Sequence, residues 1–500
     1  MKKNFALLWA VAAGLLTVGC STTDGGEANY VYLSMNEGID GEPQMPIEGG
    51  DKFEEYKDNP FVVVADQPTS TFSVDADGAS YAITRRYLSS GFRINPSGVR
   101  IEELLNYFTF NYPSPWGNEM IAINAEVGEC PWNAEHRLLR LGIKGKELTA
   151  NEVPLANYVF LVDVSGSMNG RDRLDLLKSG LTQLLYQLNP EDRISLITYS
   201  GEVKKLLEST SVKEAGKIKE AISKLRADGC TAGGEALKMA YEEALANYDP
   251  KKNNRVIMGT DGDFNVGVTN TAALVEMVES YARKGIYMTC LGFGLGNLND
   301  SMMEKVSNSG NGTYYYIDSE DEMMKVFVHE RERFVAVAND TKCQVAFNKD
   351  IVSQYRLIGY ENRVMSNEDF EDDKKDAGEI GAGQTITALY EIILNPDGIN
   401  SINNAEPVFV TFDCRYKKAL NDASIDLQKT LTTDKIFNKN MRSSEFYFAA
   451  GIAAWGMILR DSPYKGDATL KMAKNLVTEG LAFDPHGYRA ELLKLMDKEP

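Results

Sequence analysis

The sequence predicts an α/β fold: a doubly wound, mainly parallel six-stranded sheet inserted in a β-rich domain formed from both flanks, with C-terminal helices. Three observations support this prediction. Strand and helix patterns alternate over residues 156–336, which is typical of a parallel sheet covered on both faces. The flanks at 56–150 and 339–426 have the alternating pattern of antiparallel strands. Residues 427–500 are mainly apolar at helical spacing.

Bulk composition restricts the classes of function. The chain has 500 residues, of which 43% are hydrophobic, enough for about three domains with substantial cores. The formal net charge is −19. Because binding to phosphates needs basic patches, which no segment supplies, we expect no nucleic-acid partner.

The N-terminus has the pattern of an export signal. Two lysines precede an apolar run at 5–18 that is too short to span a membrane. The run ends at Gly19-Cys20, which resembles a bacterial lipoprotein cleavage site, although Thr17 stands where that pattern prefers Leu. The resemblance implies a signal peptide over 1–20, lipidation of Cys20 and attachment to a membrane of the cell envelope, periplasmic or at the outer-membrane surface. An ordinary signal peptide with an incidental cysteine is the alternative.

Residues 21–55 lack periodicity and are expected to form a flexible tether before the N-terminal flanking region. This α+β region is predicted to contain helices and strands at 70–75, 79–88, 99–108, 121–127 and 138–144. The last two segments alternate, so we expect strands with one buried face. Four acids of the region are expected to cap helices or to face solvent: Asp75, Asp77, Glu102 and Glu103.

The central region contains six strand patterns, at 158–163, 193–199, 203–210, 255–261, 286–293 and 313–317. The first is apolar on both faces and ends abruptly in Asp163, Ser165 and Ser167. Ligands of open α/β sheets bind at the carboxyl ends of the strands. Because all three side chains offer oxygen, they suit a hard divalent cation and do not suit zinc.

Two later segments add to this set. Gly229-Cys230-Thr231 opens a helix and offers a hydroxyl, and the strand from 255 ends at Thr260-Asp261-Gly262. Asp-x-Ser-x-Ser, a Gly-rich Thr segment and Thr-Asp-Gly, in this order, resemble the metal-ion-dependent adhesion site of von Willebrand factor A domains. The resemblance implies Ser165, Ser167 and Thr231 as hydroxyl ligands and Asp163 and Asp261 as acidic ones. The expected cofactor is Mg²⁺, with Mn²⁺ or Ca²⁺ as alternatives.

A simpler interpretation is that Asp163 and Ser165 cap the helix that starts near Arg173. One segment alone would favour capping. The three segments together favour the metal site.

The pattern of the C-terminal flank predicts antiparallel strands. Residues 443–459 are predicted to form a buried helix rather than a membrane span. Further helices are expected at 468–481 and 489–496. A disulfide from Cys130 to Cys343 or to Cys414 is possible, but the sequence does not decide between them. Segments of both flanks, including 70–81 and 355–363, resemble a group of bacterial lipoproteins with an A domain.

These observations predict a membrane-anchored, divalent-cation-dependent protein-binding module for adhesion or scaffolding. The cation would recognise a carboxylate of an unidentified protein partner. A metal-dependent hydrolase and a purely structural envelope protein are the alternatives. An enzyme is not expected, because no nucleophile elbow or P-loop is present and His136, His329 and His486 lie away from the metal motif.

Overall fold

The computed structural model describes residues 50–228, 234–262, 271–400, 406–437 and 442–498. The chain divides into two units, Met1–Glu42 and Pro43–Pro500, and every described residue belongs to the second. Cys20 and Thr231 lie outside the described residues.

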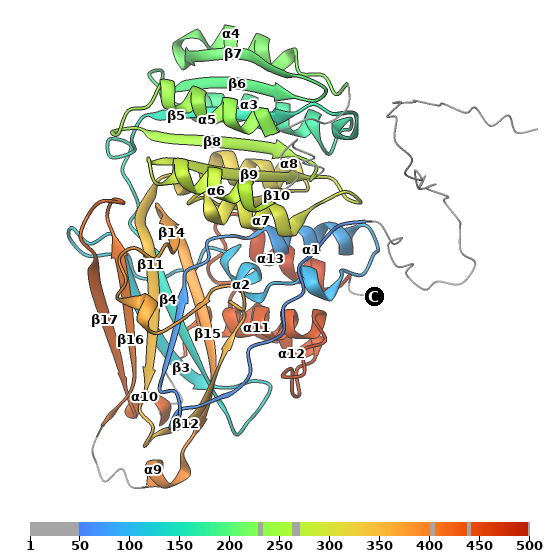
Figure 1. Ribbon diagram of the computed structural model, residues 1–500. Helices are drawn as coiled ribbons and strands as arrows, with labels where there is room; N and C mark the ends of the chain where they lie inside the picture. The colour runs from blue at the N-terminus through green and yellow to red at the C-terminus, as the bar shows by residue number, and fades with distance from the viewer. Residues whose placement is uncertain (1–49, 229–233, 263–270, 401–405, 438–441, 499–500) are drawn as a thin grey trace, which may run out of the picture. The chain divides into compact units, whose positions relative to one another are not determined.

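The central region folds around the predicted six-stranded sheet, in the order β10-β9-β8-β5-β6-β7 (Figure 1). Neighbouring strands are parallel, except that β7 runs antiparallel to β6 at the edge. The strands are β5 (Ala156–Asp163), β6 (Arg193–Tyr199), β7 (Val203–Ser211), β8 (Asn253–Thr260), β9 (Ile286–Phe293) and β10 (Tyr314–Ile317).

Helices cover both faces of this sheet because its strands are apolar on both sides. Along β5, Val159 and Leu161 join one core and Phe160 and Val162 join the other. The first face packs against α5 (Gly234–Ala246), α6 (Thr271–Ala282) and α7 (Asp300–Ser309). The second packs against α3 (Leu174–Gln187), α4 (Ala215–Ser223) and α8 (Glu320–Met324), which a π-helical turn extends to His329.

The flanking residues form two antiparallel sheets that share one core. One has the order β1-β12-β15-β4-β3: β1 (Val62–Val63), β12 (Val352–Ile358), β15 (Thr385–Leu394), β4 (Arg137–Gly145) and β3 (Ile121–Glu129). The other has the order β13-β2-β11-β16-β17: β13 (Val364–Met365), β2 (Thr69–Ser73), β11 (Ala336–Phe347), β16 (Val408–Lys417) and β17 (Ile425–Thr432), with β14 (Gly378–Gly381) paired to β11.

Both sheets combine strands from before and after the central region. Phe72 of β2 lies opposite Cys343 of β11, and Leu141 of β4 lies opposite Ala388 of β15. The predicted insertion of the α/β domain into a β-rich domain built from both flanks is therefore confirmed. The last strand, β17, continues beyond residue 426 to Thr432.

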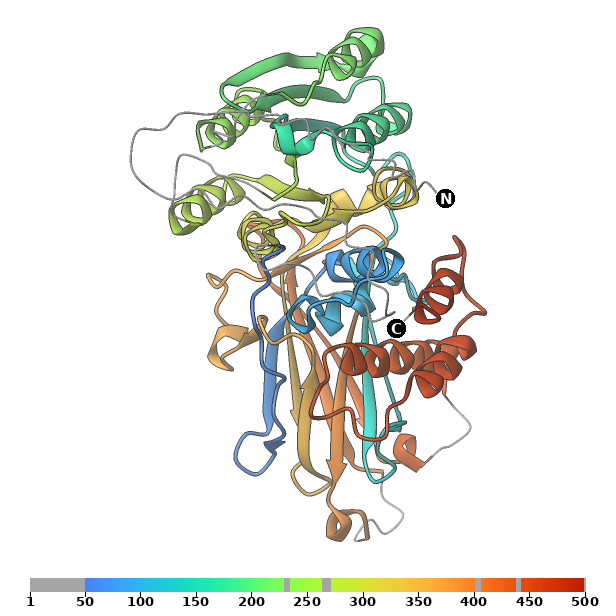
Figure 2. The ribbon, with the colours of Figure 1, turned by 90° about the vertical axis from the view of Figure 1, so that its right-hand side faces the viewer.

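Helices of both flanks pack together beside the β-rich domain. They are α1 (Ala79–Ser89), α2 (Ile101–Asn106), α11 (Ser444–Leu459), α12 (Leu470–Glu479) and α13 (Tyr488–Met496), with short helices α9 (Pro396–Asn400) and α10 (Asp434–Phe437) elsewhere. Helix α11 is apolar around its circumference and contacts α2, α12 and β4 (Figure 2). Consequently β4 is buried on both faces, and the expectation of one exposed face was wrong for this strand. Among the described residues no helix has both the length and the apolar composition needed to cross a bilayer.

Two further expectations need correction. Cys130, Cys343 and Cys414 are free thiols, and Cys343 lies directly opposite Cys414, so neither bridge to Cys130 forms. The four acids expected to cap helices or to face solvent, Asp75, Asp77, Glu102 and Glu103, are at most 1% exposed, so none of them faces solvent. Glu103 does accept a hydrogen bond from the Ser80 backbone N–H at the start of α1, so its expected capping role is observed, but in the interior.

Candidate metal centre

The predicted acids meet at one edge of the parallel sheet. β5 and β8 are hydrogen-bonded neighbours in a register that pairs Val162 with Gly259, so both strands end at the same level. Asp163 is the last residue of β5, and Asp261 follows the last residue of β8. Both carboxylates are buried, at 0% and 1% exposure. The sheet therefore brings together two acids that lie far apart in the sequence.

The loop after β5 holds the two serines beside Asp163. The Ser165 backbone N–H donates to Asp163 Oδ1 over 2.8 Å, and a 3₁₀ turn at Gly166–Met168 follows. The Ser165 and Ser167 hydroxyls are 2.9 Å apart. Met168 is fully buried and anchors the turn, whereas Ser167 is exposed. The three side chains thus form one oxygen-lined surface with access from solvent.

The alternative that Asp163 and Ser165 cap the next helix is not supported. Helix α3 begins at Leu174, its N-cap residue is Arg173, and no side chain caps it.

Two residues near the acids were not predicted from the sequence. Thr260 donates its hydroxyl to Asp163 Oδ2 over 3.0 Å and accepts the Gly262 backbone N–H at 3.2 Å, which fixes the end of β8 against β5. Arg173 places Nε 4.0 Å from Asp261 Oδ2. Thr260 could have been found, because it immediately precedes the predicted ligand Asp261. Arg173 could not, because its position depends on the turn that leads into α3.

Burial raises the pKa of Asp163 to about 6, and the neighbouring Asp261 charge adds to this effect. Hydrogen bonds from Ser165 and Thr260 act in the opposite direction. Among the described residues no positive charge contacts Asp163 itself, and Arg173 lies 4.0 Å from the neighbouring Asp261. Carboxylates and hydroxyls in such a position fit a hard divalent cation.

Thr231, the fifth predicted ligand, lies in the segment 229–233 outside the described residues. The chain on its N-terminal side is described: the Asp228 backbone N–H donates to Val164 O over 2.9 Å, next to Asp163. Helix α5 begins on the other side, at Gly234. Four of the five predicted residues are therefore placed, and all four lie at one strand-end edge.

The three histidines, in the part of the chain that the structure describes, contact residues away from the strand-end site. His136 Nδ1 is 2.5 Å from Glu391 Oε1, and His329 stacks on His486 with ring centroids 4.3 Å apart. Neither arrangement includes a residue of the strand-end site.

Three family models match the chain. The von Willebrand factor type A domain matches residues 157–329, a model described as von Willebrand factor matches 47–140, and one described as the C-terminal part of uncharacterized protein YfbK matches 332–500. The first two agree with the resemblance noted in the sequence. Proteins with this domain are typically adhesion or protein-interaction modules, and the domain commonly binds a divalent metal.

The chain is 35% identical over 475 residues to uncharacterized protein YfbK of Escherichia coli (strain K12), covering 90% of this chain and 81% of the relative. It is 30% identical over 225 residues to inter alpha-trypsin inhibitor heavy chain 4 of Mus musculus, but these are 42% of this chain and only 23% of that protein. Neither name describes an enzyme. Among solved structures, a von Willebrand factor type A protein from Catenulispora acidiphila aligns with 78% of this chain and 91% of its own, at 16% identity and a TM-score of 0.47. The chain belongs to the family of YfbK and contains a von Willebrand factor type A domain.

Proposed function

We propose that this protein is a membrane-anchored, divalent-cation-dependent protein-binding module that recognises an acidic side chain of a partner protein. Asp163, Ser165, Ser167, Thr231 and Asp261 would hold the cation, and a carboxylate of the partner would complete its coordination. Mg²⁺ is the expected ion, because it favours oxygen ligands in octahedral geometry and keeps exchangeable water positions.

The observation that carries this proposal is the convergence of Asp163, Ser165, Ser167 and Asp261 at one edge of the sheet. The two hydroxyls are neutral, so a cation held there keeps part of its positive charge. The exposed position of Ser167 leaves a direction from which a partner can approach. A site with these properties attracts a carboxylate.

The surface beside the serine loop supports an acidic partner. An open cavity of about 670 Å³ lies between α3 and α4 and reaches Asn169 of the loop. Lys178, Lys219 and Arg226 contribute to its lining, together with one acid, Asp175. Although the chain has a net charge of −19, this basic groove is lined by three basic side chains and one acidic one. It would attract further acids that flank the recognised carboxylate.

The metal dependence is tested by comparing Ser165→Ala with Ser200→Ala. Ser200 follows the end of the neighbouring strand β6 and makes a suitable control. We expect Mg²⁺ at 100 times its Kd to stabilise the native chain and the Ser200→Ala variant by about 2.7 kcal/mol, and the Ser165→Ala variant much less. Capture of a binding protein from envelope extract should follow the same order. Equal capture in Mg²⁺ and in chelator would contradict the proposal.

The membrane anchor is tested separately through Cys20. We expect Cys20→Ser to move the protein from the membrane fraction to the soluble fraction without changing its thermal unfolding. Membrane association that persists in this variant would contradict lipid anchoring at Cys20.

A further inference from the structure

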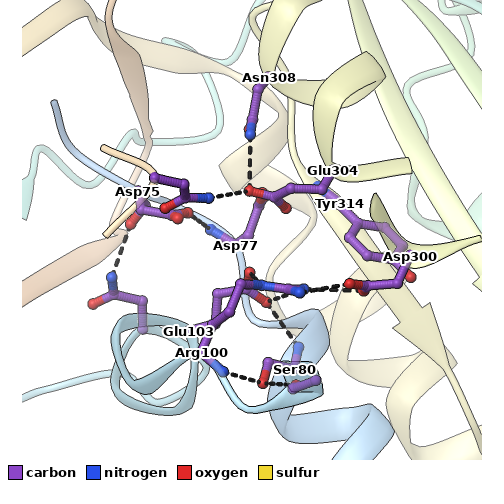
Figure 3. Close-up of polar contacts among 12 residues, drawn as sticks. Asp75, Asp77, Ser80, Arg100, Glu103, Asp300, Glu304, Asn308 and Tyr314 are labelled. Carbon is purple, nitrogen blue, oxygen red and sulfur yellow. Dashed lines mark hydrogen bonds and ion pairs between the residues drawn. The ribbon is translucent and has the colours of Figure 1, made fainter. Parts of the chain in front are cut away.

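A second group of acids lies where the N-terminal flank meets the A domain. We call it the junction cluster, and it consists of Asp75, Asp77, Glu103, Asp300 and Glu304 (Figure 3). The first two acids follow β2, Glu103 is on α2, and the last two are on α7 of the A domain. All five side chains are between 0% and 3% exposed. Three segments that are distant in the sequence therefore bury their acids at one place.

Two arginines neutralise only part of this charge. Arg100 is bonded to Glu103 and donates to both oxygens of Asp300, over 2.5 and 3.0 Å. Arg363 Nε donates to Asp75 Oδ2 over 3.2 Å, and its Nη2 lies 3.5 Å from Glu304 Oε1. Five carboxylates thus face two guanidinium groups. Burying uncompensated charge is costly, so the acids in excess must either stay protonated or bind an additional cation.

The spacing of the oxygens fits a single cation. One carboxylate oxygen each of Asp75, Glu103 and Glu304 lies within 4.8 Å of the others. Ca²⁺ binds oxygen ligands at about 2.3–2.6 Å, so oxygens on opposite sides of the ion are up to about 5 Å apart. Within the described residues no other set of three potential ligands of this kind occurs.

Glu304 provides an independent indication of a missing ligand. Its Oε1 accepts hydrogen bonds from the side-chain amides of Asn308 and Asn362, over 2.8 and 3.2 Å. Its Oε2 is buried, and no described residue donates a hydrogen bond to it. Figure 3 shows the carboxylate directed toward Asp75 and Asp77. A buried carboxylate oxygen without a partner costs free energy unless an ion or a water binds it.

A cavity approaches the junction cluster from solvent. A cavity of about 300 Å³ is lined by buried Asp77 and by Asn308 and Arg363, and also by the exposed residues Lys375 and Asp376. The cavity thus reaches Asp77 of the junction cluster, whereas Asp75, Glu103 and Glu304 lie behind its lining.

We propose that Asp75, Glu103 and Glu304 bind a hard divalent cation, Ca²⁺ in preference to Mg²⁺, which fastens the A domain to the N-terminal flank. Ca²⁺ is favoured because the ligands are carboxylates in an irregular, enclosed arrangement, whereas Mg²⁺ requires near-octahedral geometry and retains several waters. The ion is enclosed by ligands of this chain and stabilises the junction. This inference is independent of the proposed recognition function.

The test uses the full chain carrying Ser165→Ala, so that the strand-end site does not contribute. We expect added Ca²⁺ to raise the melting temperature of this variant, and bound calcium after dialysis to be one ion per chain. Addition of Glu304→Gln should weaken the apparent calcium affinity by about 10-fold or more. Because this change removes one buried charge, the metal-free double variant should fold, and far-UV circular dichroism checks it.

Glu102→Gln is the matched control. Glu102 lies next to Glu103 on α2 and is 1% exposed, but it is outside the proposed ligand set. The calcium response should be the same with and without this change. The proposal is overturned if Ca²⁺ does not bind to the Ser165→Ala protein, or if Glu304→Gln leaves the calcium affinity unchanged.

Discussion

The strand-end site and the junction cluster are both built from buried acids, but they differ in their other ligands and in their access to solvent. The strand-end site combines two acids with serine hydroxyls, and Ser167 is exposed. The junction cluster consists of five buried acids that contact two arginines, of which Arg100 is buried and Arg363 is partly exposed.

This difference separates two uses of similar chemistry. Neutral ligands and an open side leave a cation able to accept a group from another molecule. Charged ligands in an enclosed space hold parts of the same chain together. The first arrangement suits recognition and the second suits stability, and each can be disturbed without direct change to the other because they use different strands and helices.

The largest expected effect comes from Arg100→Ala in the junction. The change leaves Glu103 and Asp300 buried without their guanidinium partner, which costs about 3–5 kcal/mol of unfolding free energy. Denaturant unfolding in chelator measures the loss. If the junction cluster only stabilises the contact between the A domain and the flank, the folded fraction of the variant should still be stabilised by Mg²⁺ at the strand-end site. A loss below 1 kcal/mol would show that the cluster is not a stabilising contact.

An effect that reaches a similar size only at high pH is expected from Glu102→Gln. Burial raises the pKa of Glu102 to about 8, with the Glu361 charge as a further cause. An acid with a raised pKa in the folded state does not affect stability at low pH. It destabilises increasingly as pH rises from about 4.5, its unfolded value, to about 8. In chelator, the unfolding free energy of the variant should therefore rise relative to that of the native chain by up to about 1.4 kcal/mol per pH unit in this range. A difference independent of pH would contradict the raised pKa.

A third prediction compares two glycine substitutions to test the contact between Arg173 and Asp261. Gly294 has φ +69°, and a Cβ there would collide with the Arg173 guanidinium, which lies beside Asp261. Gly296 has φ +90° but open space around it. Gly294→Ala should therefore cost more stability than Gly296→Ala, by about 1 kcal/mol beyond the shared backbone strain of about 1 kcal/mol. It should also weaken Mg²⁺ binding, and equal Mg²⁺ affinities in the two variants would remove Arg173 from the site.

The smallest effect is expected from the basic groove. Lys178→Gln should weaken capture of an acidic partner by less than about 1 kcal/mol, and the difference should shrink at high salt, because the lysine acts through a screened charge. Lys238→Gln, an exposed lysine on α5, is the control. Identical salt dependence in both variants would show that the groove does not contact the partner.

The strand-end site was predictable because its position follows from local pattern and one topological rule. Asp163 and Asp261 each follow an apolar strand, and parallel strands end at a common edge. The junction cluster was not predictable in this way. Asp75 and Glu103 resemble helix-capping acids, and their burial depends on Arg363 and Asp300, which lie hundreds of residues along the chain.

The same reasoning explains the other differences. The expected half-exposed strand β4 is covered by α11, a helix about 300 residues later, so its alternation gave no sign of the second buried face. The alternating strands of both flanks were recognisable, and their union in one β-rich domain followed from treating the A domain as an insertion, but the strand order and register did not. Long-range burial of charge was the feature that local pattern could not supply.

The interleaved flanks also set an order of events during synthesis. The A domain is continuous in sequence, so it can fold as soon as its own residues have left the ribosome. The β-rich domain cannot close then, because β2 must wait for β11 and β4 for β15. Arg85 of α1 waits longer, since its partners include Asp318 and, on α13, Glu491. While the residues after β10 are being made, this protein is therefore a finished A domain that carries unpaired strands, and the second flank completes the fold.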